Sequence, residues 1–182
     1  MSSTRVPKVL ISRMEINNAI TRLASAITAD YQGKYPVIIS ILKGSFMFTA
    51  DLIKCLNFPL EVEFIRLSSY GKRQESSEKI RVVQGLHFPI KNRNVLVVED
   101  IVDTGLTISF LMEYLKKRKP ASLKLCALSE KPSRRRIPVT IDYLGFTVPD
   151  KFIVGYGTDW DEKYRYLPDI CIMESLEFKV QS

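Results

Sequence analysis

The sequence predicts an α/β fold in which a mainly parallel, twisted sheet is flanked by helices. Short apolar stretches that suit buried strands alternate along the chain with segments whose apolar residues recur at helical spacing. The strongest strand pattern, at residues 94–98, leads through a short turn into such a helix. This alternating order is typical of parallel sheets with right-handed crossover connections.

Apolar periodicity and capping signals define the predicted elements. Ser12 and Glu15 have the spacing of a capping box, and Ile16, Ile20 and Leu23 follow at helical intervals. The polar residues 68–77 lie between two alternating segments, which predicts a mobile loop in an antiparallel hairpin. In order, we expect a helix to about residue 30, a strand at 36–42, a helix to 56, hairpin strands at 61–67 and 79–83, a strand at 94–98, a helix at 106–117, and strands at 122–129, 141–144 and 152–154.

Length and composition are those of an ordinary folded protein. The chain has 182 residues, of which 46% are hydrophobic and 26% are charged, and this balance excludes a disordered or collagen-like chain. Neither a repeat nor a long linker interrupts it, so we expect a single domain over residues 1–182. The first residues do not resemble a signal peptide, and the apolar runs are too short to cross a bilayer, which predicts a cytoplasmic protein.

Cysteine and histidine usage narrows the chemistry. Cys55, Cys126 and Cys171 show no C-x-x-C spacing and have apolar neighbours, so we expect reduced and mostly buried thiols rather than disulfides or a zinc site. His87 is the one histidine, which excludes a cluster of several histidines around a metal. A catalytic triad would depend on that residue alone.

The net charge of +7 is compatible with nucleic acid, a membrane surface or a polyanionic small molecule. Its densest runs are residues 116–119 and 134–136, and both suit solvated helix ends and loops. Neither run is interleaved with aromatic residues as a platform for single-stranded nucleic acid would be.

The segment from Val97 to Thr107 carries the chemistry. Three carboxylates, those of Glu99, Asp100 and Asp103, follow a buried strand and precede a Thr-Gly-x-Thr turn into a helix. Free N–H groups at a helix N-terminus favour phosphate, and paired carboxylates accept hydrogen bonds from sugar hydroxyls or hold Mg²⁺. The implied ligand therefore contains ribose and phosphate. The alternative is that these acids only cap the helix.

This segment resembles the ribose-phosphate motif of type I phosphoribosyltransferases, and residues 37–165 are similar to the hypoxanthine-guanine branch of that family. The resemblance implies the type I phosphoribosyltransferase fold, with a small hood made from the N- and C-terminal segments and a flexible hairpin loop. It implies Mg²⁺-dependent transfer of the phosphoribosyl group of 5-phosphoribosyl 1-pyrophosphate to N9 of hypoxanthine or guanine. The products would be IMP or GMP and pyrophosphate. A homodimer or homotetramer is implied, without a membrane or nucleic acid partner.

The resemblance also assigns site residues. Asp103 would face N7 of the purine as a general base or hydrogen-bond acceptor. The ribose and 5′-phosphate would be held by Glu99, Asp100, Asp103, Thr104, Gly105, Leu106 and Thr107. Pyrophosphate would contact Lys43 and Gly44, where a strained or cis peptide before the glycine exposes backbone N–H groups, and it would also contact the Arg165 side chain. The purine would meet Lys131, Phe152, Ile153 and Asp159, the flexible loop would contribute Ser69 and Tyr70, and the metal would be held by Glu99, Asp100 and Asp159.

Lys131 has a consequence for specificity under this interpretation. An ammonium group only donates hydrogen bonds, so it favours a 6-oxopurine over adenine. Without the resemblance, Lys131 would be interpreted as a surface lysine and Phe152 as a core aromatic residue. The chain departs from the family pattern with Leu106 in place of a basic residue, Ser45 in place of a glycine and Thr158 in place of an aliphatic residue.

Two other functions fit parts of the sequence. A nucleotide-sensing, RNA-binding regulator could use the same fold and the positive charge. A nucleotide-binding protein without transferase activity is the other alternative, and loss of the Asp103 carboxylate would mark it. The segments around Lys131 and Phe152 favour the enzyme because they resemble a pocket for a 6-oxopurine.

Overall fold

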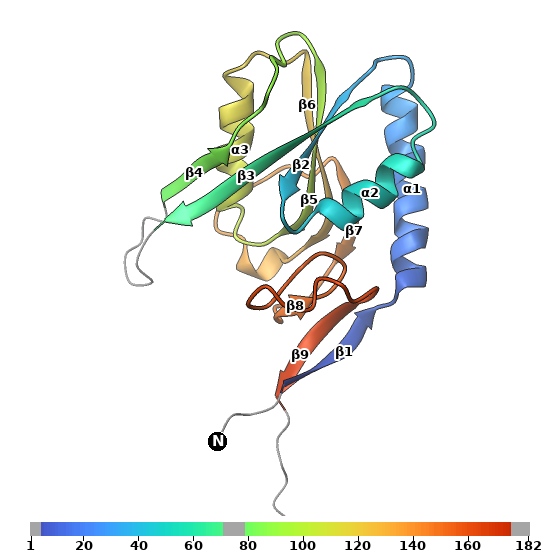
Figure 1. The fold of residues 1–182 in the computed structure, drawn as a ribbon, viewed down its shortest axis with the longest axis vertical. Helices are drawn as coiled ribbons and strands as arrows, with labels where there is room; N and C mark the ends of the chain where they lie inside the picture. Colours follow the sequence, from blue (N-terminus) through green and yellow to red (C-terminus); the bar gives the residue numbers. More distant parts are fainter. Residues whose placement is uncertain (1–4, 71–78, 176–182) are drawn as a thin grey trace, which may run out of the picture.

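The computed structural model describes residues 5–70 and 79–175, which form two sheets (Figure 1). The larger sheet has six strands, and all of its neighbouring pairs are parallel except β3 with β4. This confirms the predicted α/β architecture. In spatial order, its strands are β4 (Lys79–Gln84), β3 (Glu61–Tyr70), β2 (Val37–Leu42), β5 (Asn94–Val102), β6 (Ser122–Glu130) and β7 (Tyr143–Thr147).

Helices cover both faces of the larger sheet because successive strand residues point to opposite sides. Ile38 and Leu96 are buried with the helices of one face, and their neighbours Ile39 and Val97 are buried with the helix of the other. The first face carries α1 (Arg13–Tyr31) and α2 (Phe46–Lys54), the second carries α3 (Leu106–Lys116), and a short 3₁₀ turn spans Pro132–Arg134.

The first helix begins where its sequence signal predicts. The Ser12 hydroxyl accepts a hydrogen bond from the Glu15 N–H at 3.3 Å, and the Glu15 carboxylate accepts one from the Ser12 N–H at 2.8 Å. Two donors that the helix leaves unpaired are thereby satisfied. Residues Ile16, Ile20 and Leu23 lie on the buried face.

The smaller sheet is antiparallel and forms the hood at one end of the molecule (Figure 1). It joins the two ends of the described chain, and its strands are β1 (Arg5–Ile11), β9 (Ile170–Ser175) and β8 (Ile153–Val154). The sequence analysis did not identify β1 or β9, and it was wrong to place residues 152–154 in the main sheet. Ile153 and Val154 pair with Ile172 and Cys171 instead. Two apolar residues cannot by themselves indicate which sheet they join.

Two main-sheet strands are longer than the apolar pattern predicted. β5 continues to Val102, so Glu99 and Asp100 lie inside the strand rather than after it. β3 continues to Tyr70, with Ser69 paired to Ile80, so the first part of the expected loop is strand. The remainder of that loop, residues 71–77, lies outside the described residues.

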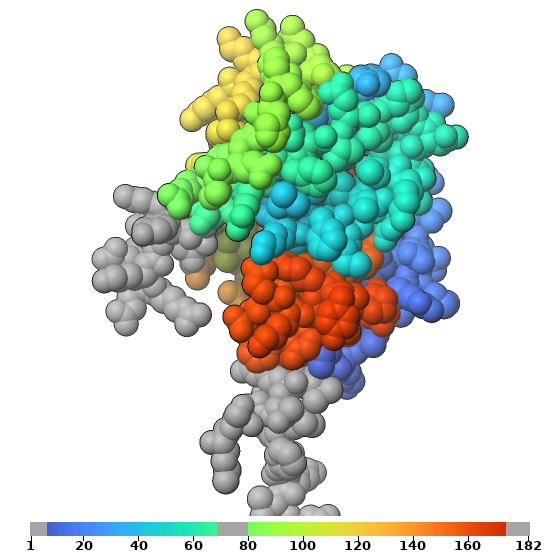
Figure 2. All heavy atoms as spheres, viewed as in Figure 1, coloured from blue at the N-terminus to red at the C-terminus, as the bar shows by residue number. Residues whose placement is uncertain are grey.

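The hood is anchored to the main body by specific contacts. The Tyr156 hydroxyl donates to the Asp51 carboxylate on α2 at 2.6 Å, and the Arg13 N–H donates to the Asp169 carboxylate at 2.7 Å. In Figure 2 the segment drawn in orange-red, which includes Tyr156, packs directly against the cyan α2 segment. These contacts hold the hood beside the carboxyl ends of the parallel strands.

Two expectations about thiols and membranes can be compared with the structure. Cys126 and Cys171 are buried free thiols as expected, whereas Cys55 is exposed at the end of α2. Burial raises the pKa of the Cys171 thiol.

Across the described residues, no helix combines the length and the apolar character that crossing a bilayer requires.

Glu63 is a buried carboxylate that fixes the connection between β4 and β5. It accepts hydrogen bonds from the N–H groups of Phe64 at 2.9 Å and His87 at 3.1 Å, and the His87 ring lies 3.2 Å away. Burial alone would raise the pKa of Glu63, but the hydrogen bonds outweigh burial and lower it. The one histidine therefore has a structural partner.

We predict that Glu63→Gln destabilises the fold in a pH-dependent way. The lowered pKa means that the carboxylate stabilises the folded state above its unfolded pKa of about 4.5 and that this contribution disappears as pH falls through the folded value. Denaturant unfolding at pH 7 should show a loss of about 1.5 to 3 kcal/mol, which shrinks in acid. As a control, Glu61→Gln on the same strand changes a partly exposed ion pair with Arg93 and should cost less than about 1 kcal/mol. Equal effects of the two substitutions would contradict this account.

Candidate active site

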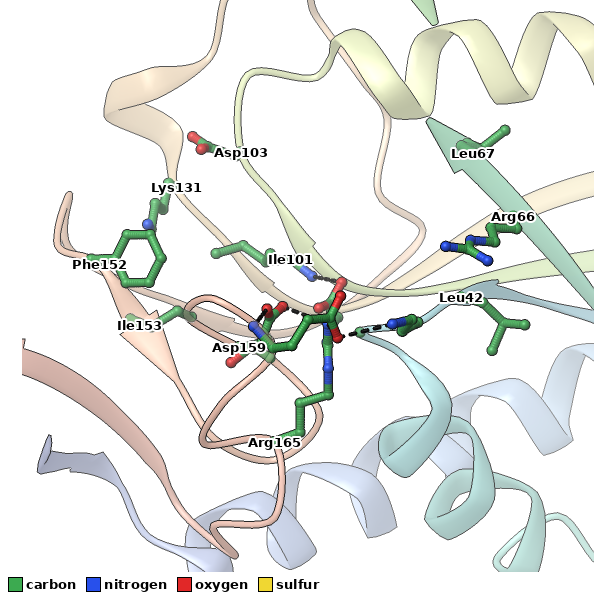
Figure 3. Close-up of a pocket in the computed structure, with 15 residues that line it drawn as sticks. Leu42, Arg66, Leu67, Ile101, Asp103, Lys131, Phe152, Ile153, Asp159 and Arg165 are labelled. Atoms are coloured by element: carbon green, nitrogen blue, oxygen red, sulfur yellow. Dashed lines mark hydrogen bonds and ion pairs between the residues drawn. The ribbon is translucent and has the colours of Figure 1, made fainter. Parts of the chain in front are cut away.

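A cavity of about 410 Å³ lies between the carboxyl ends of the parallel strands and the hood (Figure 3). Five separate segments line it. They are the end of β2 and the loop after it (residues 42–44), residues 66–67 of β3, the end of β5 and the turn after it (residues 100–103), Lys131 after β6, and parts of 152–165 in the hood. Ligands of open α/β sheets bind at this edge because loops from neighbouring strands converge there. The cavity is therefore the candidate site.

Glu99 and Asp100 approach the site from different pockets. Adjacent residues of a strand face opposite sides, so Asp100 lines the main cavity while Glu99 lines a neighbouring pocket of about 70 Å³. Asp103 lines both pockets and joins them. Burial raises the pKa of Glu99 well above its usual range and that of Asp100 to about 6. Both carboxylates are thus in surroundings that favour binding a cation or a hydrogen-bond donor.

The Thr-Gly-x-Thr turn has the conformation that a phosphate site needs. Gly105 has φ +85° at the start of α3, and a Cβ there would lie 2.5 Å from the Ile137 carbonyl oxygen, so glycine is required. The N–H groups of Arg136 and Ile137 donate to the Thr104 carbonyl oxygen and secure the turn from the other side. Thr104, Gly105 and Thr107 line the smaller pocket with Glu99. Within the described chain, Leu106 lines neither pocket.

The loop after β2 packs directly against Asp100. A Cβ at Gly44 would lie 1.8 Å from an Asp100 carboxylate oxygen, and a Cβ at Gly157 would lie 2.2 Å from the Gly44 carbonyl oxygen. Glycine at both positions therefore brings β2, β5 and the hood together. The cis peptide lies between Leu42 and Lys43, one residue before the Lys43–Gly44 bond considered from the sequence.

Ser45 is compatible with this loop although a glycine is common there in the family resembled. Its buried hydroxyl donates to the Ile41 carbonyl oxygen at 2.7 Å and lies 2.8 Å from the Ser40 hydroxyl. The side chain is thus directed into the protein and leaves the backbone N–H groups on the cavity side unobstructed by a hydroxyl.

Lys131 and Phe152 form the opposite end of the cavity (Figure 3). Lys131 is only 6% exposed and Phe152 is 51% exposed, so neither the surface lysine nor the core aromatic interpretation holds. Burial lowers the pKa of Lys131, and the carboxylates of Asp103 and Asp150 oppose that effect. The Phe152 ring packs edge-on against Trp160 at 6.2 Å between centroids and keeps one part open to the cavity. Ile153 lines the same wall.

Asp103 has a partner that the sequence analysis did not identify. The Arg134 Nε lies 3.0 Å from an Asp103 carboxylate oxygen, and its Nη1 lies 3.4 Å from Asp150. The basic run 134–136 had been interpreted as a solvated loop. Arg134 lies three residues after Lys131, in a 3₁₀ turn that brings its side chain to Asp103. The contact depends on this turn, which the sequence pattern does not indicate.

Arg165 lies on the hood side of the cavity and makes three contacts through its Nη groups. Its Nη2 lies 2.7 Å from the Asp159 carboxylate and 3.1 Å from that of Glu162, and its Nη1 donates to the Gly157 carbonyl oxygen at 2.7 Å. Glu162 also contacts Lys43 at 2.9 Å. The two cations expected to bind pyrophosphate therefore share one acidic neighbour, which the sequence analysis missed.

The expected metal ligands are only partly brought together. Asp100 and Asp159 line the same cavity, whereas Glu99 lines the neighbouring pocket. Among the described residues, no group of three or more histidine, cysteine or acidic side chains is close enough to hold a metal ion by itself. Strand alternation directs Glu99 and Asp100 into different pockets, and the assignment of Glu99, Asp100 and Asp159 to a metal stays a prediction.

Ser69 and Tyr70, expected in the flexible loop, belong to the end of β3, where Tyr70 pairs with Lys79 of β4. Their side chains lie outside the described part of the structure. On the same strand, Arg66 and Leu67 line the cavity, although the sequence did not indicate them. Arginine and leucine in an alternating strand carry no signal that distinguishes a cavity wall from an ordinary strand face.

Comparison with known proteins agrees with this geometry. A family model described as phosphoribosyl transferase domain matches residues 12–161. The hypoxanthine-guanine phosphoribosyltransferase of Bacillus subtilis (strain 168) is 42% identical over 169 residues, which cover 93% of this chain and 94% of the relative.

Solved structures extend the comparison to the fold. A hypoxanthine-guanine phosphoribosyltransferase from Bacillus anthracis matches with a TM-score of 0.87 and 44% identity, covering 91% of this chain and 97% of that one. A mutant hypoxanthine phosphoribosyltransferase from Trypanosoma cruzi, in a ternary substrates complex, matches with a TM-score of 0.85 and 41% identity over 92% and 95% of the two chains. The type I phosphoribosyltransferase fold with its hood is confirmed. The chain belongs to the hypoxanthine-guanine phosphoribosyltransferase family of type I phosphoribosyltransferases.

Proposed function

We propose that this chain is a purine-salvage enzyme that transfers the phosphoribosyl group of 5-phosphoribosyl 1-pyrophosphate to N9 of hypoxanthine or guanine. The reaction forms IMP or GMP and releases pyrophosphate. One observation carries the proposal: a single cavity joins a buried lysine and an open aromatic ring at one end to paired cations at the other, with Asp103 lining it. Along the cavity, Lys131 and Phe152 suit a purine, the carboxylates of β5 suit a ribose, and Lys43 and Arg165 suit a pyrophosphate.

The donor lies along the carboxyl ends of β5 and β2. The 5′-phosphate binds at the turn of Thr104, Gly105 and Thr107, where α3 begins at a glycine that has no side chain to cap it. Glu99 and Asp100 accept hydrogen bonds from the ribose hydroxyls. The pyrophosphate lies against the Lys43–Gly44 loop and Arg165, whose forked N–H donors suit a phosphate group.

The residues of the cavity fit a Mg²⁺ ion that arrives with pyrophosphate. Asp100 and Asp159 line the same cavity, and burial together with the Asp159 charge raises the pKa of Asp100 to about 6, so a cation there would relieve an unfavourable site. These two carboxylates would hold the ion directly or through water. When bound, Mg²⁺ neutralises charge on the pyrophosphate leaving group.

The purine binds between Phe152 and Lys131. Phe152 offers a ring face for stacking, and Lys131 donates a hydrogen bond to the 6-oxo group. Asp103 accepts the proton or hydrogen bond at N7 and thereby makes N9 a better nucleophile towards the anomeric carbon. Most of the rate enhancement comes from holding base and ribose in line and from excluding water from the reacting carbon.

We also propose that residues 1–182 act as one domain in the cytoplasm, as a homodimer or homotetramer. The strands β1 and β9 support the single domain because they join both ends of the described chain in one hood. A structure of the Trypanosoma cruzi relative concerns the role of its C-terminal region in oligomeric state and activity, and it matches this chain with a TM-score of 0.88.

A panel of bases tests the function. Purified protein with Mg²⁺ and 5-phosphoribosyl 1-pyrophosphate should form nucleotide and pyrophosphate from hypoxanthine or guanine, and not from adenine or uracil. Chromatography of the products and a pyrophosphate assay measure both. If no base gives a product while the protein binds RNA at physiological salt, the RNA-binding alternative replaces this proposal.

We predict that Asp103→Asn lowers kcat by about 10²- to 10⁴-fold with little change in KM for the donor, because it removes the proton acceptor at N7. Steady-state kinetics with both substrates varied measures the effect. Asp150→Asn is the matched control, since Asp150 contacts the same Arg134 without lining the main cavity. An equal loss in both variants would assign the effect to Arg134 rather than to the Asp103 carboxylate.

We predict that Lys131→Gln lowers kcat/KM for hypoxanthine and guanine by about 10- to 100-fold, the loss expected for one charge-assisted hydrogen bond. The kcat/KM for adenine should rise relative to the values for hypoxanthine and guanine, because the glutamine amide oxygen can accept a hydrogen bond from the 6-amino group of adenine. Competition between bases measures the ratio. Lys151→Gln, an exposed lysine in the neighbouring turn, serves as the control and should leave the ratio unchanged. An unaltered ratio in Lys131→Gln would remove Lys131 from base selection.

A further inference from the structure

Glu162 lies between the two cations at the pyrophosphate end of the cavity. One oxygen of its carboxylate, Oε2, is 2.9 Å from the Lys43 Nζ and 3.1 Å from the Arg165 Nη2. The three side chains come from two segments far apart in the sequence, the loop after β2 and the hood, and all line the same cavity. A single oxygen that bridges two cations from separate segments is how a phosphate oxygen would also bind there.

The Nη groups of Arg165 make three contacts within the protein. Nη2 is shared between Asp159 and Glu162, and Nη1 donates to the Gly157 carbonyl oxygen. Its Nε is buried and finds no hydrogen-bond partner among the described residues. A pyrophosphate that takes up the Nη2 donors of Arg165 therefore competes for them with the Asp159 and Glu162 carboxylates.

The surrounding loop holds the Glu162 backbone while leaving its carboxylate able to move. The Glu162 N–H donates to the Asp159 carboxylate at 2.8 Å, and a bridge between Trp160 and Lys163 closes the turn. The Glu162 side chain, in contrast, is 65% exposed. Exposed ion pairs are weak because water competes for both partners, so the carboxylate can rotate into solvent without unfolding the loop.

We propose that Glu162 is a built-in competitor for pyrophosphate. It neutralises Lys43 and Arg165 in the ligand-free protein and is displaced when the donor binds. Its return after the reaction assists the release of pyrophosphate. This inference rests on the proposed function, because that function assigns Lys43 and Arg165 to pyrophosphate.

The proposal predicts that Glu162→Gln gains affinity for pyrophosphate. Isothermal titration of the full chain with inorganic pyrophosphate and Mg²⁺ should give a Kd about three- to tenfold lower than that of the unmodified protein, since the competing charge is gone. Glu162→Ala should show a gain at least as large. The glutamine of the first variant keeps an amide oxygen that could still accept from Lys43, and alanine has none. In kinetics, pyrophosphate should become a stronger product inhibitor by a similar factor.

Asp161→Asn is the matched control. Asp161 precedes Glu162 on the same loop, its side chain is 82% exposed, and its ion-pair partner is Lys163 at 3.7 Å rather than Lys43 or Arg165. The substitution changes the net charge by the same amount. An equal gain in Asp161→Asn would attribute the effect to overall charge and would overturn the proposal.

The outcomes for this inference and for the proposed function are separable. If the unmodified protein forms nucleotide and binds pyrophosphate, but both Glu162 variants bind it no more tightly, Glu162 is not a competitor. If the unmodified protein forms no nucleotide from any base and does not bind pyrophosphate, the proposed function itself fails. Thermal unfolding of each variant confirms that an absent gain in affinity does not reflect a loss of fold.

Discussion

The close contact between Gly44 and Asp100 is the constraint on which the site depends. An added Cβ at Gly44 would lie 1.8 Å from the Asp100 carboxylate, and one at Gly157 would lie 2.2 Å from the Gly44 carbonyl oxygen. Absence of side chains at these two positions lets the ends of β2 and β5 meet beneath the hood. The loop with Lys43, the acidic end of β5 and the hood can then face one cavity.

Charge balance is the second organising feature of that cavity. Asp103 is paired with Arg134, and Glu162 with Lys43 and Arg165, while burial raises the pKa of Glu99 and Asp100. A ligand that brings phosphates and hydroxyl groups, with a divalent cation, exchanges these internal pairs for its own.

Local signals in the sequence were sufficient for much of the fold and for many of the site residues. The capping box at Ser12, the apolar strand before Glu99 and the Thr-Gly-x-Thr turn each depend on neighbouring residues alone, so they could be identified from the chain. The predicted ends of two main-sheet strands were too early. β5 and β3 continue into polar residues because hydrogen bonds to neighbouring strands, rather than apolar side chains, stabilise them there.

The sequence by itself determined the alternating α/β order and the Thr-Gly-x-Thr turn, because short-range periodicity and motif spacing encode them. Its resemblance to the family pointed to Lys131 and Phe152, which line the cavity. Only the tertiary structure decided that Glu99 and Asp100 face different pockets, that Ile153 and Val154 join the hood, and that Arg134 and Glu162 reach the site. These features depend on strand alternation and on contacts between distant segments. Such contacts arise from packing in three dimensions, and no local pattern in the chain specifies them.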